Sequence, residues 1–76
     1  MIPMAQNRKY VGTVRLFKEA KTFHVELNTK TGTVYIGRNK KGPWVHCAYE
    51  VTHESDALSH ALDFAEKNYE MLSELK

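Results

Sequence analysis

The stretch that most constrains this chain is its C-terminal segment, residues 55–76, the only long segment with a helical period. At 100° per residue, its apolar side chains fall on one face, namely Leu58, Ala61, Leu62, Ala65, Tyr69 and Leu72, extended by Ala57, Phe64, Met71 and Leu75. The charged side chains lie opposite: Asp56, Asp63, Glu66, Lys67, Glu70 and Glu74. The pattern predicts one helix over residues 53–75, with an apolar arc wider than the ~100° that a surface helix needs.

The segments upstream of this helix read as short strands joined by polar turns. Residues 10–17, 22–27, 33–37 and 43–51 are rich in β-formers, and residues 22–27 alternate cleanly between apolar and polar side chains. The turns at residues 28–32 and 39–42 each begin with asparagine and end with glycine. Residues 1–8 have no period and are expected to form a flexible arm, or a short extension of the sheet edge. We therefore predict an α+β fold: a four-stranded antiparallel meander over residues 10–51, order 1-2-3-4, with the helix packed on one face (ββββα).

The size and composition of the chain fit a single small domain over residues 1–76. A chain of this length buries about 60% of its unfolded surface, so its core is small. Cys47 is the only cysteine, which excludes an internal disulfide and suits a reducing compartment. The N-terminus lacks the apolar run of a signal peptide, and no stretch approaches the ~18 apolar residues of a membrane span. We expect a soluble, cytoplasmic protein without a membrane partner.

The alternation of the strands divides the predicted sheet into two faces. The face toward the helix is expected to hold Val14, Leu16, Phe23, Val25, Leu27, Val34, Ile36, Val45, Cys47 and Tyr49. The opposite face then carries Thr13, Arg15, Phe17, His24, Glu26, Tyr35, Trp44 and His46. Charge is unevenly distributed as well, because residues 1–53 have a net charge of +6 and residues 54–76 of −4. Such polarity can steer an anionic partner to one side, although helices also favour glutamate and turns favour lysine for local reasons.

Aromatic rings flanked by cations are what single-stranded nucleic acid needs, since bases stack on rings and phosphates pair with lysine and arginine. On this basis the candidate binding residues are Arg15, Phe17, His24, Tyr35, Arg38, Lys40, Lys41, Trp44 and His46. The same face could instead form an interface with a partner protein or with another copy of the chain, or its rings could merely make cross-strand pairs. The alternative function is a modulator or inhibitor of a host protein or ribonucleoprotein complex, of the small phage- or plasmid-borne, anti-CRISPR-like kind. Such a protein would act through the sheet face or through its acidic helix, whose carboxylates would mimic phosphates.

Catalytic and metal chemistry find little support in the sequence. The four histidines and Cys47 lack ligand spacings such as CxxC or HExxH, so we predict no metal and no cofactor. Gly32, Gly37 and Gly42 are too scattered for a phosphate loop and are expected to be turn residues. Cys47 is expected to face the core as an inert thiol. We therefore expect a binding protein and not an enzyme.

The length of the predicted helix suggests self-association. A helix of this length spans roughly 33 Å, whereas four strands make a sheet under ~20 Å wide. The C-terminal half is expected to overhang the sheet and to form a homodimer interface through Phe64, Met71, Leu72 and Leu75. In its order of elements alone, the predicted chain resembles dimeric single-strand DNA-binding transcription cofactors of the Whirly type.

Overall fold

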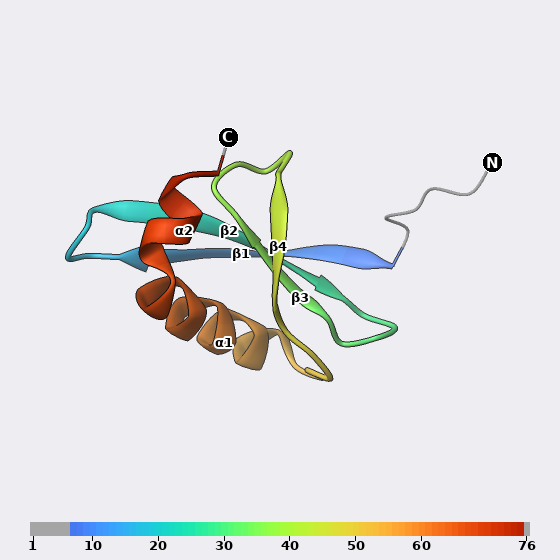
Figure 1. Cartoon of the computed structure of the whole chain (residues 1–76). Helices are drawn as coiled ribbons and strands as arrows, with labels where there is room; N and C mark the ends of the chain where they lie inside the picture. Colours follow the sequence, from blue (N-terminus) through green and yellow to red (C-terminus); the bar gives the residue numbers. More distant parts are fainter. Residues whose placement is uncertain (1–6, 76) are drawn as a thin grey trace.

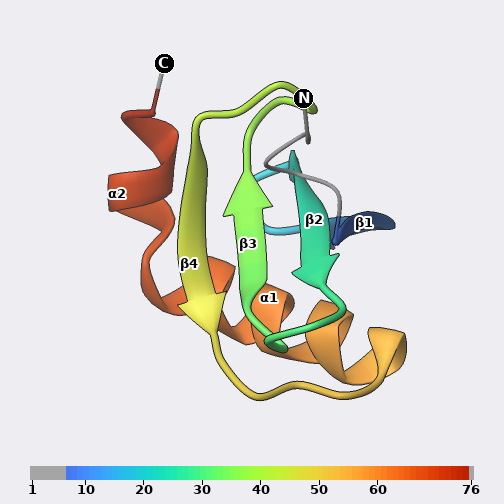
Figure 2. The same cartoon turned by 90° about the vertical axis from the view of Figure 1, so that its right-hand side faces the viewer.

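The computed structural model describes residues 7–75 and contains one antiparallel sheet with the strand order β1-β2-β3-β4. The strands are β1 (Arg8–Leu16), β2 (Lys21–Asn28), β3 (Val34–Gly37) and β4 (Trp44–Ala48), followed by helices α1 (Glu54–Lys67) and α2 (Tyr69–Ser73). Figures 1 and 2 show α1 lying across one face of the sheet. The predicted α+β class, the meander and the packing of the C-terminal helix on the sheet are confirmed.

The core lies between the sheet and α1. In β2, Phe23, Val25 and Leu27 alternate with partly exposed neighbours, so all three side chains point toward the helix and are buried. The helix contributes Ala57, Ala61 and Ala65 to the core, one every fourth residue, and all three are fully buried. Alanine at this spacing gives α1 a narrow contact face that can lie close to the strands. The other buried residues are Val14, Leu16, Val34, Ile36, Val51 and Leu72.

The turns follow the predicted chemistry. The side-chain Oδ1 of Asn28 accepts hydrogen bonds from the backbone N–H groups of Lys30 and Thr31, at 2.9 and 3.0 Å. Gly32 closes this turn at a φ of +79°, and a Cβ there would lie 2.7 Å from the backbone nitrogen of Val51. Only glycine fits this position, because both the backbone conformation and the space exclude a side chain. The second turn places Gly42, at a φ of +91°, before Pro43.

Two register shifts alter the predicted strands. In β1 the pairing with β2 shifts between Tyr10 and Gly12, which leaves Val11 as the extra residue of a β-bulge. Gly12 adopts a φ of +134° there. As a result Arg8 and Tyr10 lie on the same face of the sheet as Thr13 and Arg15, although their positions in the sequence differ in parity.

The second shift, between β3 and β4, makes Cys47 the extra residue, since Ala48 pairs with Val34 and His46 with Tyr35. The prediction that Tyr49 faces the helix is wrong for this reason: β4 ends at Ala48, and Tyr49 is 65% exposed. Val45 and Cys47 do pack against the core, but only partly buried. The fourth strand is also shorter than the predicted residues 43–51, because the chain turns at Glu50, whose φ is +59°.

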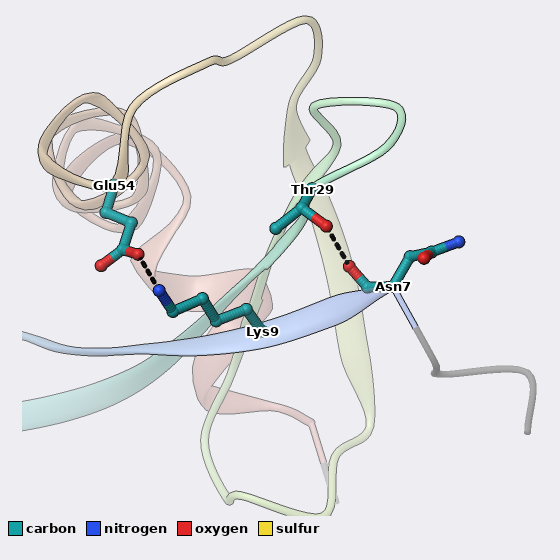
Figure 3. A network of polar contacts seen from close by, with 4 residues as sticks. All are labelled: Asn7, Lys9, Thr29 and Glu54. Atoms are coloured by element: carbon teal, nitrogen blue, oxygen red, sulfur yellow. Dashed lines mark hydrogen bonds and ion pairs between the residues drawn. The ribbon is translucent and has the colours of Figure 1, made fainter.

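The N-terminal end of β1 is tied to two other elements, as Figure 3 shows. The carbonyl of Asn7 accepts hydrogen bonds from the backbone N–H of Thr29, at 2.9 Å, and from its hydroxyl, at 3.1 Å. Farther along the strand, Lys9 forms an ion pair with Glu54 at the start of α1. Asn7 and Arg8 therefore belong to the fold and not to the predicted arm over residues 1–8, of which residues 1–6 lie outside the described part of the chain.

The predicted single helix over residues 53–75 is interrupted at Asn68. This residue leaves the helical conformation, with φ −125° and ψ 30°, and its backbone N–H and side-chain Nδ2 both donate to the carbonyl of Phe64. The chain then turns into α2, which leaves α1 at an angle (Figures 1 and 2). Arg38 holds the end of α2, because its Nη1 donates to the carbonyls of Ser73, at 2.8 Å, and Leu75, at 3.0 Å. Neither described helix is long and apolar enough to cross a membrane.

Candidate functional site

The face of the sheet opposite α1, here called the outer face, carries the side chains that point away from the core. From the four strands these are Arg8, Tyr10, Thr13, Arg15, Thr22, His24, Glu26, Tyr35, Trp44 and His46. None of them is buried in the structure as described, and all the fully buried side chains lie on the other face. The outer face is thus the face of the sheet that α1 leaves open to a partner.

Arg8 lies at the centre of this face. Its guanidinium carbon is 3.7 Å from the ring centroid of Tyr35 and 5.4 Å from that of Trp44. A guanidinium at these distances is attracted by the electron-rich faces of both rings. Nη2 of Arg8 also lies 2.9 Å from a carboxylate oxygen of Glu26, the only carboxylate within the four strands. We call these four residues the central cluster: Arg8, Glu26, Tyr35 and Trp44. In it the guanidinium of Arg8 lies over two aromatic rings, and the carboxylate of Glu26 balances its charge.

The guanidinium of Arg8 retains unused hydrogen-bonding capacity. Its Nε is shielded from solvent and has no hydrogen-bond partner among the described residues. Nη2 is shielded too, and its approach to Glu26 is an ion pair without hydrogen-bond geometry. A small shift of this side chain would expose two donors that match a phosphate or carboxylate group.

A second group of side chains extends the face toward the edge strand β1. The hydroxyl of Tyr10 lies 2.7 Å from Nδ1 of His24 on the neighbouring strand. Lys40 reaches back from the turn between β3 and β4, so that its ammonium group is 5.0 Å from the ring centroid of Tyr10. The turn lysine thus contributes its charge to the outer face itself.

On the other side of the central cluster, His46 links two tyrosines. Its ring contacts Tyr35 edge to face, with centroids 4.9 Å apart, and lies 6.1 Å from the ring of Tyr49. The pairing of the strands places Tyr10, Glu26, Tyr35 and His46 in one row across the sheet. The aromatic and histidine rings therefore form a row across the sheet, from Tyr10 in β1 to Tyr49 after β4. Glu26 is the one carboxylate in this row.

Trp44 takes its place because its cross-strand neighbour is a glycine. Trp44 pairs with Gly37, and a Cβ built on Gly37 would lie 3.1 Å from Cε3 of the indole ring. The indole therefore covers the space that a larger residue at position 37 would occupy. Gly37 thus acts as a packing residue, not a turn residue as the sequence suggested.

The structure brings together five of the nine predicted binding residues: His24, Tyr35, Lys40, Trp44 and His46. Arg15 and Phe17 lie farther along the β1–β2 hairpin, past the end of the pairing between β2 and β3 at His24. Arg38 is engaged with the carbonyls at the end of α2, and Lys41 is exposed in its turn.

The sequence reasoning missed three aromatic or cationic candidates on this side of the sheet: Arg8 and Tyr10 on the outer face, and Tyr49, which contacts His46 just after β4. Gly12 is the signal that would have placed Arg8 and Tyr10 on the outer face. A glycine inside a strand pattern marks a bulge, and a bulge exchanges the faces of the residues that precede it. Tyr49 was assigned to the wrong face because nothing in the residues around Cys47 marks the second bulge.

Cys47 has the environment of an inert thiol. It is partly buried against the core, and burial raises its pKa to about 12. The thiolate needed for nucleophilic or metal chemistry is therefore scarce at neutral pH. Among residues 7–75, no three histidine, cysteine, aspartate or glutamate side chains gather in a group that could hold a metal ion.

The four residues predicted for a dimer interface differ in exposure. Leu72 is fully buried in the core of its own chain, so it is unavailable to a second copy and this part of the prediction is wrong. Phe64 and Leu75 are partly buried against the same core, whereas Met71 is 41% exposed. The break at Asn68 is the cause, because it turns the apolar side of α2 back onto the domain.

Comparison with known proteins adds no relative. The chain matches no protein-family model, and neither curated proteins nor solved structures give a match.

Proposed function

We propose that the protein binds single-stranded nucleic acid across the outer face. The observation that carries this proposal is the row of rings and cations from Tyr10 to Tyr49, on a sheet face whose only strand carboxylate is already paired with Arg8. Aromatic side chains offer stacking to any base at about 1–3 kcal/mol each. Lysine and arginine beside them supply partners for the phosphates.

Within this proposal the residues have different roles. Tyr10 and Tyr49 are the tyrosines of the face with the most open rings, 39% and 65% exposed, and they are the platforms for bases. Tyr35 and Trp44 are partly covered by Arg8, so they support its guanidinium, on whose free side a base stacks. Lys40 and Lys41, in the turn between β3 and β4, bind the phosphates of the nucleic-acid backbone.

The test uses the fluorescence of Trp44, the only tryptophan, during titration with a short single-stranded oligonucleotide at several salt concentrations. We expect quenching, with a slope of log K against log salt near −0.7 per phosphate contact. Tyr10→Ala and Tyr49→Ala should each weaken binding by about 1–3 kcal/mol without changing this slope. Lys40→Ala should make the slope less steep by roughly one contact.

Lys67→Ala is the matched control, since it removes the same charge from the helix side, where Lys67 pairs with Asp63. It should leave both affinity and slope unchanged. If the oligonucleotide causes no quenching and no mobility shift at low salt, the proposal is overturned. Equal effects of Lys67→Ala and Lys40→Ala would show only a general charge attraction, which also contradicts it.

A protein partner is the second candidate function, and one observation favours it. The ring face of Tyr35 is occupied by Arg8, and Lys40 lies over the ring of Tyr10, so part of the stacking surface is already used. A protein interface uses tyrosine edges and hydroxyls as readily as ring faces. If the titration shows no binding of the oligonucleotide, binding of a protein partner becomes the leading proposal. That proposal includes inhibition of a host complex.

Self-association remains a separate proposal. Met71 is exposed, and Phe64 and Leu75 are only partly covered, which supports a homodimer through this smaller patch. Sedimentation equilibrium should then give twice the chain mass of 8.8 kDa. Met71→Asp should return the protein to a monomer with an unchanged circular dichroism spectrum, and a monomer at every concentration in the parent chain would refute the dimer.

A further inference from the structure

The outer edge of β1 is a second surface with the features of a binding site. β1 is the first strand in the sheet order, so it pairs only with β2, and alternate backbone N–H and C=O groups point away from the sheet. The bulge at Val11 interrupts this edge near its start. The regular part that could accept another strand therefore runs over residues 12–16.

A hollow lies at the end of this regular edge. It has a volume of about 440 Å³ between the β1–β2 hairpin and α1, and it is lined by Arg15, Leu16, Phe17, Lys18, Glu19, Leu62 and Glu66. Phe17 is 84% exposed and does not belong to the core. Figure 1 shows the hairpin projecting beyond β3 and β4. A large aromatic side chain in this position is not needed for the fold, but it can anchor a partner.

We infer that the free edge of β1 docks an extended acidic segment of a partner protein, which adds to the sheet as a further strand. An apolar side chain of that segment fills the hollow against Phe17 and Leu62. Backbone hydrogen bonds give such a complex its affinity, and the hollow gives it specificity. This inference concerns a different surface from the outer face and does not depend on nucleic-acid binding.

The positive charge along β1 favours an acidic partner segment. Arg8 and Lys9 precede the bulge and are already paired with Glu26 and Glu54. β1 contains no carboxylate, and its regular edge carries Arg15, followed in the hairpin by exposed Lys18 and Lys21 around a single Glu19. A strand laid beside β1 places its side chains next to these cations, where opposite charges are favourable and like charges are not. A second copy fits poorly, because antiparallel self-pairing of residues 12–16, centred on Val14, would place the Arg15 side chains of the two copies diagonally next to each other on one face. An acidic segment of another protein places carboxylates, and not further cations, next to these side chains.

The probe is a short synthetic peptide in which glutamate alternates with leucine and valine, carrying a fluorescent label for anisotropy. Two matched peptides test the mechanism: one has lysine in place of every glutamate, and the other has methylated backbone nitrogens on the side that would pair with β1. We expect binding of the glutamate peptide only. In the complex, backbone amides of residues 12–16 should gain protection from hydrogen exchange.

The protein variants test the location. Phe17→Ala should weaken peptide binding about 10-fold, and Arg15→Glu by at least as much, whereas Lys30→Glu makes the same charge change at an exposed position in the turn between β2 and β3 and should have little effect. Phe17 is exposed, so its removal leaves the fold intact, as an unchanged Trp44 emission spectrum would verify.

Equal binding of the lysine or the methylated peptide would overturn the inference, as would binding without protection of the β1 amides. No binding of the glutamate peptide would overturn it too. Protection of these amides by an oligonucleotide and not by the peptide would assign the edge to nucleic acid instead.

Discussion

Two neighbouring residues of α2 provide a sharp test of the C-terminal architecture. Leu72 is fully buried, whereas Met71 beside it is 41% exposed. Leu72→Ala should lower the free energy of unfolding by about 2–5 kcal/mol, the cost of removing a buried leucine side chain. Met71→Ala should cost less than about 1 kcal/mol. Both changes introduce alanine into the same short helix, so helix propensity changes little and the difference isolates burial.

The expected loss is large for so small a domain. At roughly 0.05–0.15 kcal/mol per residue, a chain of 76 residues has a free energy of unfolding of about 4–11 kcal/mol. Urea denaturation followed by Trp44 fluorescence measures the change. With a slope m near 1 kcal/mol per molar urea, Leu72→Ala should lower the midpoint by about 2 M or more, and m itself should stay constant.

The opposite order of the two costs would refute the fold-back of α2. If α1 continued straight through Asn68, as the sequence periodicity suggests, both side chains would overhang the sheet. Leu72→Ala would then be nearly neutral in a monomer, or both variants would lower the midpoint only at concentrations where a dimer forms. Repeating the denaturation over a range of protein concentrations separates these outcomes, because only the stability of a dimer depends on concentration.

Two substitutions and the reactivity of one thiol test other parts of the structure. Gly37→Ala should destabilise the domain by about 1–3 kcal/mol and shift the Trp44 emission, because its Cβ would lie 2.8 Å from the carbonyl oxygen of Pro43 and 3.1 Å from the indole; an unshifted spectrum would contradict this packing. Gly12→Val should cost about 1–3 kcal/mol in denaturant unfolding, because valine is strained at a φ of +134°; a neutral result would argue against the bulge. Burial raises the pKa of Cys47 from its ordinary value of 9.0 to about 12, so iodoacetamide should react slowly with the native protein and faster in urea. Because the folded pKa is the higher one, this contribution to stability is complete below pH 9.0 and is lost as the pH rises toward about 12; constant stability over that window would contradict the burial.

The fold was predictable because its central strands are regular. Phe23, Val25 and Leu27 alternate without interruption, and the turns on both sides of β3 carry asparagine and glycine where the backbone needs them. A period of two fixes which face of each strand is buried, and short turns fix which strands are neighbours. The same regularity placed His24, Tyr35, Trp44 and His46 correctly on the outer face.

The break in the helix was not predictable from periodicity. Leu72 continues the apolar face of Leu58, Leu62 and Ala65 on a helical wheel, so the pattern has the same appearance with or without a break. The break at Asn68 depends on tertiary contacts instead: Leu72 is buried in the core, and Arg38 from the β3–β4 turn binds the last carbonyls of α2. Such contacts join residues far apart in the sequence and leave no local signal.

The bulge in β1 has a physical cause that the sequence does contain. In a strand without a bulge, Val14 and Leu16 would fix the even positions toward α1, so Arg8 and Tyr10 would face the helix and Lys9 would face solvent. An arginine beneath the helix would lose its hydration without a partner, at a cost of several kcal/mol. The bulge adds Val11 as an extra residue, which the positive φ of Gly12 makes possible. It exchanges the faces of the sheet on which Arg8, Lys9 and Tyr10 lie. Lys9 then reaches Glu54 at the start of α1, and Arg8 reaches Tyr35 and Glu26 on the outer face. The conflict between an apolar C-terminal half and a charged N-terminal half of one strand therefore requires a shift of register near Gly12, and that shift places an arginine at the centre of the proposed binding face.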